Sequence, residues 1–171
     1  MKKKGVFFGS SSGTTEDVAQ RIAKELGIAA TDIYDVGKAK VKDVEPYEIL
    51  ILGSSTLGSG DLQDDWDDFL PKLKKAGLAG KSVAIFGTGD SSSFSYTFCD
   101  GIGLIYDGLK ATGAVFGGFV PVDGYSFDDS AAVTGGSFVG LPLDEMNESD
   151  LTGGRIAAWA AQLKKEFGLT D

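Results

Sequence analysis

The sequence has no histidine, a single cysteine, four prolines and no long hydrophobic run. Without histidine, Ser-His-Asp triads, the usual zinc sites and histidine-ligated haem are excluded, because each of them depends on an imidazole. One cysteine cannot form a disulfide within the chain, which favours a reducing compartment. The apolar run after Lys4 is too short for a secretory signal, and no segment reaches the about 20 apolar residues of a membrane span. We therefore expect a cytoplasmic protein.

Basic residues are also scarce, with 16 Lys and Arg against 25 Asp and Glu, a net charge of −9. This balance argues against nucleic-acid binding through a basic face and against docking on an anionic membrane. The acidic excess lies in residues 43–154, which hold 18 acidic and 5 basic side chains. Two interpretations remain open: the charge serves solubility, or it forms an acidic face that steers a basic partner.

The length of 171 residues is that of one domain, and we expect a single domain over residues 1–171. Apolar segments of strand type alternate with segments of helical period from end to end, which predicts a doubly wound parallel α/β sheet. Pro71 is expected to disturb the second helix. The expected strands are 5–9, 31–36, 48–53, 82–87 and 114–120, with strand character again at 138–143, and the expected helices are 14–26, 64–76, 98–111 and 152–167.

Three of the expected strands end in loops of similar composition, rich in glycine and in residues with hydroxyl side chains. These loops are 9–15 (GSSSGTT), 53–60 (GSSTLGSG) and 87–94 (GTGDSSSF). In open parallel sheets, ligands bind at the carboxyl ends of the strands near the point where the winding order reverses. The three loops together therefore predict one small-molecule site.

The first loop has the composition of a phosphate site. Its hydroxyls and Gly13 directly precede a helix, whose free N–H groups attract anions. The loop is neither a Walker A sequence, because no Lys follows the glycine, nor a dinucleotide-binding GxGxxG motif. The alternative is that these serines and threonines only cap the helix.

This loop, in its setting between a short apolar strand and a helix, resembles the start of a flavodoxin. The resemblance covers essentially the whole chain, and the combination of its motifs is highly specific. The other matching segments are Ser55 and Thr56, 61–73 (DLQDDWDDFLPKL), 86–90 (FGTGD), 98–103 (FCDGIG), 123–130 (DGYSFDDS), 138–145 (FVGLPLDE) and 151–168.

The resemblance implies a flavodoxin-like, three-layer, doubly wound five-stranded parallel sheet in the order 2-1-3-4-5. The segment between Val120 and Phe138 is similar to the insertion that splits the fifth strand in long-chain members. The implied function is that of a low-potential one-electron carrier with non-covalently bound FMN, an electron-transfer protein and not an enzyme. Its implied partners are redox proteins, such as NADPH-dependent flavodoxin or ferredoxin reductases and low-potential oxidoreductases, that dock on the acidic face of a monomer.

The resemblance also implies which residues bind the cofactor. The first loop would hold the FMN phosphate through Ser10, Ser11, Ser12, Gly13, Thr14 and Thr15. Ser55, Thr56, Leu57 and Gly58 would line one side of the isoalloxazine ring, and Thr88, Gly89 and Asp90 would meet its pyrimidine edge. Phe94 would stack on the other face, with Phe98 and Asp100 close by.

Three positions depart from the pattern of many flavodoxins. Leu57 stands where they carry Trp, and Phe94 where they usually carry Tyr. Met146 replaces an Asp that touches the ribityl chain in some relatives, so Met146 is not assigned to the site.

Other functions remain as alternatives. An NAD(P)H:quinone reductase shares FMN and the fold, but it would need a substrate pocket over the flavin, and no segment obviously supplies one. A scaffold that has lost FMN is a further possibility. A receiver domain would need acidic residues after the first and third strands, and this sequence has none there. A low-molecular-weight phosphatase would need a Cys and an Arg in the first loop, which contains neither. Cys99 lies elsewhere, where a packed core thiol is expected.

Overall fold

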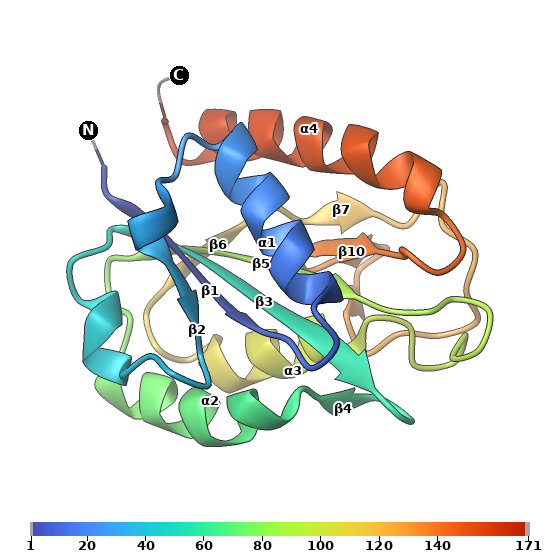
Figure 1. Cartoon of the computed structure of the whole chain (residues 1–171), viewed down its shortest axis with the longest axis horizontal. Coiled ribbons are helices and arrows are strands. Elements are labelled where there is room, and N and C mark those ends of the chain that lie inside the picture. Colours follow the sequence, from blue (N-terminus) through green and yellow to red (C-terminus); the bar gives the residue numbers. More distant parts are fainter. Residues whose placement is uncertain (1, 170–171) are drawn as a thin grey trace.

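A computed structural model describes residues 2–169 as a parallel β-sheet between two layers of helices (Figure 1). Helices α1 (Thr14–Glu25) and α4 (Ser149–Glu166) cover one face of the sheet. Helices α2 (Asp64–Ala76) and α3 (Asp100–Leu109) cover the other. Within residues 2–169, no helix has the length and apolar character needed to cross a bilayer.

The parallel strands follow the order expected for a doubly wound sheet. Strand β1 (Lys4–Gly9) lies between β2 (Ile33–Asp35) and β3 (Ile49–Leu57), and β3 pairs on its other side with β5 (Ser82–Thr88). The fifth position is shared, because β6 (Val115–Gly117) pairs with the first half of β5 and β10 (Leu141–Leu143) with its second half. The predicted α/β class and the order 2-1-3-4-5 are thus confirmed, counting β5 as the fourth strand and β6 with β10 as the fifth.

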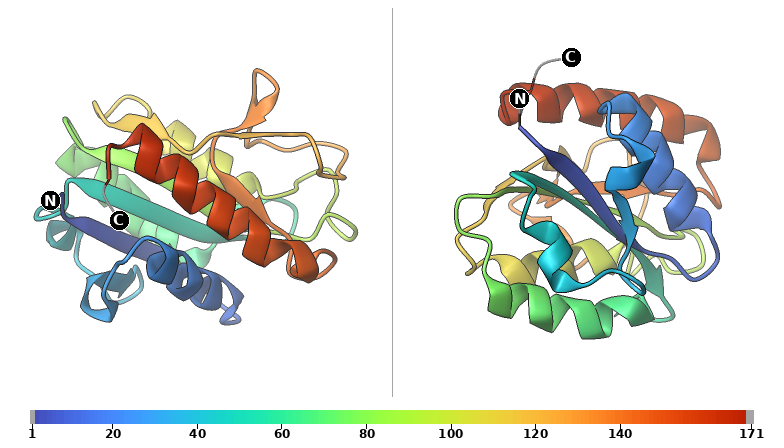
Figure 2. Two further views of the ribbon diagram at one scale, coloured as in Figure 1. Left: turned by 90° about the horizontal axis from the view of Figure 1, so that it is seen from above. Right: turned by 60° about the vertical axis from the view of Figure 1, so that its left-hand side comes forward.

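The expected strand over 114–120 is wrong in its extent. It ends at Gly117 because Gly118 adopts a positive φ of 76°, and the Gly118 carbonyl accepts a hydrogen bond from Trp159 Nε1 at 2.8 Å. The chain then forms a small antiparallel sheet beside the main one, seen projecting in the left view of Figure 2. Its strands are β7 (Val120–Pro121), β8 (Val133–Thr134) and β9 (Ser137–Phe138). This insertion therefore separates β6 from β10.

Three short elements complete the fold. Strand β4 (Asp61–Leu62) pairs antiparallel with the end of β3, and two 3-10 turns, η1 (Ala30–Asp32) and η2 (Val41–Val44), flank β2. The antiparallel β3–β4 pairing folds the chain back after Leu57, which places residues 57–61 at the carboxyl end of the sheet.

Buried apolar side chains fill both faces of the sheet. On β1, Val6 and Phe8 pack toward α1 and α4, and Phe7 packs toward α2, as expected for a strand covered on both sides. Helix α2 runs unbroken through Pro71, contrary to the expected disturbance. Phe69 and Leu73 on either side of Pro71 are buried against the sheet, and this packing outweighs the local cost of the proline.

The start of β10 offers a stability test. A Cβ added at Gly140 would lie 2.2 Å from the backbone oxygen of Ile85, which cannot move without displacing β5. We expect Gly140→Ala to lower the free energy of unfolding by about 1–3 kcal/mol. The matched control is Gly154→Ala in α4, where a Cβ meets nothing within 4 Å and should stabilise the helix by about 0.5–1 kcal/mol. Urea unfolding of both variants measures these opposite shifts, and equal stabilities would contradict the prediction.

Candidate functional site

The loops after β1, β3, β5 and β10 meet at one end of the sheet, on the right in Figure 1. They enclose a cavity of about 230 Å³. Its lining comes from all four loops, as predicted for three of them: Ser11, Ser12, Thr14, Ser55, Thr56, Leu57, Thr88, Gly89, Asp90, Phe94, Thr97, Glu145 and Met146.

The first loop presents uncommitted donors at the start of α1. Gly13 precedes the helix with a φ of 92°, in the left-handed region that glycine adopts without strain, and its N–H donates to Ser10 Oγ at 3.0 Å. In the described part of the chain no side chain caps α1, so the capping alternative is wrong. Ser12 and Thr14, whose hydroxyls lie 3.4 Å apart, line the cavity instead. Free N–H groups and hydroxyls at a helix N-terminus form an anion site.

Two contacts connect this loop to its surroundings. The buried Gln63 donates from Nε2 to Ser11 Oγ at 3.2 Å, while its Oε1 caps α2 by accepting from the Asp65 N–H at 3.0 Å. Thr15 Oγ1 lies 3.0 Å from Thr88 Oγ1, and Thr15 is 1% exposed. The Thr15 side chain therefore joins two loops in the interior and does not face the cavity. Gln63 was missed because one polar residue in an acidic stretch carries no signal of burial.

The end of β3 forms a second wall. Ser55 Oγ is buried and has no hydrogen-bond partner among the residues that the structure describes, an exceptional state for an interior hydroxyl. Thr56 Oγ1 accepts from the Gly101 N–H at 2.9 Å, which joins this wall to α3. The half-buried Leu57 follows at the rim, and Gly58 beyond it is exposed with a φ of 50°. Ser55 itself lines the cavity, so a polar ligand bound there is a candidate partner for its hydroxyl.

The third wall is the segment after β5. Asp90 Oδ1 accepts from the Ser92 and Ser93 N–H groups at 3.1 and 3.0 Å. The Ser93 N–H and the Asn147 amide hold the pKa of Asp90 below its usual range, so the carboxylate stays charged. Phe94, 45% exposed, presents its ring at the cavity.

Several expected site residues lie elsewhere. Phe98 does not reach the cavity: it is 1% exposed and packs on Phe127 and Phe138, because the turn before α3 faces the insertion, where the Phe98 N–H donates to the Asp129 carbonyl at 3.2 Å. Asp100 points toward the insertion, where its Oδ1 accepts from the Ala131 N–H at 2.7 Å, and burial raises its pKa. The lining also leaves out Ser10, Gly13, Thr15 and Gly58.

Other residues at the cavity escaped the sequence interpretation. Met146, left unassigned, lines the cavity with 76% of its surface exposed. Thr97 and Glu145 also line it. Their position depends on the insertion, which brings the chain back to β10 beside β5, and no local motif signals that. Cys99 is fully buried as expected, and burial raises the pKa of its thiol.

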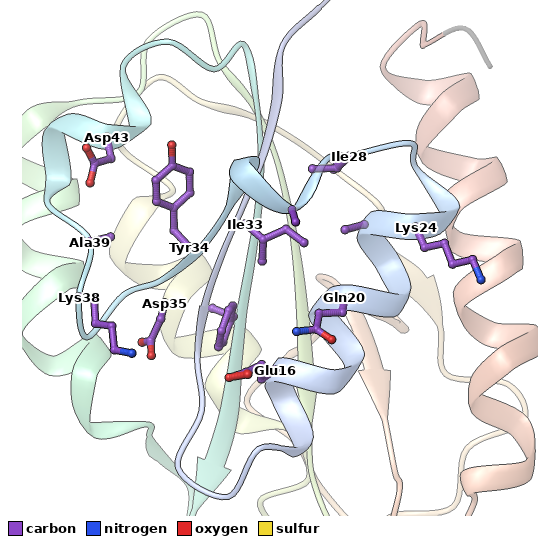
Figure 3. Close-up of a pocket in the computed structure, with 13 residues that line it drawn as sticks. Glu16, Gln20, Lys24, Ile28, Ile33, Tyr34, Asp35, Lys38, Ala39 and Asp43 are labelled. Carbon is purple, nitrogen blue, oxygen red and sulfur yellow. The ribbon is translucent and has the colours of Figure 1, made fainter.

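A larger hollow of about 880 Å³ lies at the β2 edge of the sheet, between β2 and α1 (Figure 3). Phe8, Ile28 and Ile33 contribute its apolar surface, and its rim mixes acidic side chains such as Glu16 with basic ones such as Lys24. The loops after β3 and β5 do not contribute to it. We assign the ligand to the smaller cavity, since the free helix donors and the unpaired Ser55 hydroxyl converge there.

Comparison with known proteins agrees with this geometry. Residues 6–159 match the family model described as Flavodoxin. The chain is 45% identical over 168 residues to a flavodoxin of Nostoc sp., covering 98% of this chain and 99% of that protein. It is 40% identical to flavodoxin 1 of Escherichia coli K12, covering 98% and 96%. The crystal structure of Fusobacterium nucleatum flavodoxin bound to flavin mononucleotide superposes with a TM-score of 0.88 at 33% identity, covering 97% and 99%.

Proposed function

The chain belongs to the flavodoxin family, and we propose that the whole of it is one FMN-binding domain whose cofactor occupies the cavity at the ends of β1, β3 and β5. It is an electron-transfer protein that uses non-covalently bound FMN, and not an enzyme. The observation that carries the placement is the uncapped N-terminus of α1, which opens into the same cavity as the unpaired Ser55 hydroxyl. These groups fit a ligand with a phosphate at one end and a polar ring system at the other.

Bound FMN supplies the redox chemistry, because its ring accepts and releases single electrons. The chain's own residues bind and shield it. Ser12 and Thr14 donate to the phosphate together with the first N–H groups of α1. The first basic residue after the loop is Arg21, whose Nη1 lies 3.6 Å from Glu145 Oε2, and no Lys or Arg among residues 2–169 lines the cavity. Dipoles therefore hold the phosphate charge.

The ring end of the cavity has an apolar cover and a negative environment. Leu57 and Phe94 line it and exclude water from the ring faces. Asp90 contributes a fixed negative charge, which disfavours adding further negative charge nearby and so lowers the reduction potential. We propose on this basis that the carrier works at low potential.

Flavin titration with stepwise reduction tests the assignment. The protein freed of cofactor should bind one FMN, with riboflavin binding much more weakly, and dithionite should reduce the complex in two separate one-electron steps followed by absorption. Failure to bind FMN would contradict the proposal and favour a scaffold that has lost its cofactor. Steady oxidation of NAD(P)H with a quinone as acceptor would instead favour the reductase alternative.

We further propose that the partners are redox proteins with basic faces, such as NADPH-dependent flavodoxin or ferredoxin reductases and low-potential oxidoreductases, met by a monomer in the cytoplasm. Support comes from exposed carboxylates beside the cavity. Asp61 lies next to Leu57 across the β3–β4 pairing, and Asp64, Asp67 and Asp68 lie exposed in the first turns of α2. Such a cluster on one edge steers a basic partner toward the cavity.

Salt dependence measures this steering. We expect the second-order rate of reduction by a basic-faced reductase to fall by roughly tenfold or more between about 0.05 and 0.5 M salt, as the Debye length drops well below 10 Å. The variant Asp64→Asn/Asp67→Asn should start slower and depend less on salt. If the second-order rate, measured by stopped flow at reductase concentrations below saturation, does not change with salt concentration, these carboxylates serve solubility only.

A further inference from the structure

Asp144 is a fully buried carboxylate directly behind the wall of the cavity. It follows the last residue of β10 and is 0% exposed, while its neighbours Glu145 and Met146 line the cavity. A charged group in the interior is tolerated only when hydrogen bonds replace its water shell. The donors around Asp144 therefore show what this carboxylate holds in place.

Its donors come from two loops. Oδ2 accepts from the Ser91 N–H at 3.2 Å and from the Ser91 hydroxyl. Oδ1 accepts from the Asn147 N–H at 3.0 Å, and Asn147 Nδ2 lies 3.1 Å from both oxygens. One carboxylate thus fastens the loop after β5 to the loop after β10.

Asn147 extends this connection to the cavity wall. Its Nδ2 also donates to Asp90 Oδ1 at 2.8 Å, the same oxygen that accepts from the Ser92 and Ser93 N–H groups. The Asp90 carbonyl accepts from the Phe94 N–H at 2.9 Å. A continuous series of hydrogen bonds therefore leads from Asp144 to the backbone that presents Phe94.

We propose that Asp144 is a positioning residue. It holds residues 89–94, the wall that contacts the flavin ring, in their binding conformation before FMN binds. The proposal rests on the function proposed above. Residues 89–97 contain turns and no helix or strand, so they need an external anchor. An unanchored loop would have to be ordered on binding, and that conformational entropy would be subtracted from flavin affinity. The carboxylate does not touch the ligand; it acts through Ser91 and Asn147.

The test is Asp144→Asn, which keeps the shape of the side chain and replaces one of its two acceptor oxygens by an NH₂ group. Its amide NH₂ would face donors from Ser91 or Asn147 and leave them unpaired. We expect FMN and riboflavin to weaken by the same factor, roughly tenfold or more, because the wall contacts the ring and not the phosphate. In the protein without cofactor, amide hydrogen exchange should accelerate at residues 90–94 and stay unchanged at residues 10–16.

Two further variants separate positioning from stability. Asp150→Asn makes the same chemical change at an exposed site in the first turn of α4 and should leave both readouts unchanged. Ser91→Ala removes one side-chain donor and should move both readouts in the same direction by less. A lower urea midpoint with unchanged affinity for both flavins and unchanged exchange at 90–94 would overturn the proposal. If the wild-type chain binds no flavin, the proposed function fails, while the exchange measurement still tests what Asp144 holds.

Discussion

Replacing Ser12 and Thr14 together, as Ser12→Ala/Thr14→Val, is expected to weaken FMN binding by about 10²-fold or more and to leave riboflavin binding nearly unchanged. The two ligands share the ring and the ribityl chain and differ only in the phosphate. Each hydroxyl faces the cavity beside the uncapped start of α1. A hydrogen bond to a charged group contributes about 1.5–3 kcal/mol, so two of them account for this loss.

The control for this experiment is Thr15→Val. From the sequence, Thr15 belongs with the other hydroxyls of the loop, but its Oγ1 is buried against Thr88 Oγ1. Losing that contact should lower the free energy of unfolding by about 1–3 kcal/mol, since the Thr88 hydroxyl loses its partner, while the ratio of FMN to riboflavin affinity stays near that of the wild type. Fluorescence titration of each variant with FMN and with riboflavin measures the two affinities. Equal losses of the two ligands in the double variant would refute the phosphate assignment.

The sequence predicts best those elements that depend on interactions between residues close together in the chain. Helix α2 was placed at 64–76, where the structure has it, because its period and acidic first turn are local signals. The same local signals could not show that Pro71 is accommodated. The three strand-end loops were identified because parallel strands bring their carboxyl ends together whatever lies between them.

Long-range packing explains what was missed. The alternation of polar and apolar residues could not reveal that β6 ends at Gly117, because that end depends on the contact between Gly118 and Trp159 in α4. Both Phe94 and Phe98 are phenylalanines in one turn-rich segment, yet Phe98 packs in the core against Phe127 of the insertion and Phe94 lies at the cavity. The inward turn of Thr15 likewise depends on Thr88, 73 residues away. Contacts of this kind require the folded chain.

The aromatic cover of the ring gives the second large effect. Phe94→Ala is expected to weaken both FMN and riboflavin by about 1–3 kcal/mol, or roughly 5–150-fold, because it removes the one aromatic ring that residues 2–169 contribute to the lining of the cavity. Phe94 is 45% exposed and lies outside both core clusters, so the cofactor-free protein should keep its stability. Loss of both flavins alike distinguishes this variant from the phosphate-loop variant, which loses FMN alone.

Leu57 makes the comparison sharper, because it covers the opposite wall with an aliphatic group. It is the last residue of β3, half-buried at the rim and outside both core clusters, which favours contact with the ligand over a role in the core. Leu57→Ala should therefore weaken FMN by less than Phe94→Ala does. Leu57→Trp should tighten FMN binding by up to about tenfold, or about 1.4 kcal/mol, by adding a stacking ring.

The control is Leu104→Ala, an equal truncation on the exposed side of α3. Were Leu57 a core side chain, Leu57→Ala would lower the free energy of unfolding by about 2–5 kcal/mol with FMN affinity unchanged. Fluorescence titration beside urea unfolding separates these outcomes, and unchanged affinity in both Leu57 variants would remove this residue from the site.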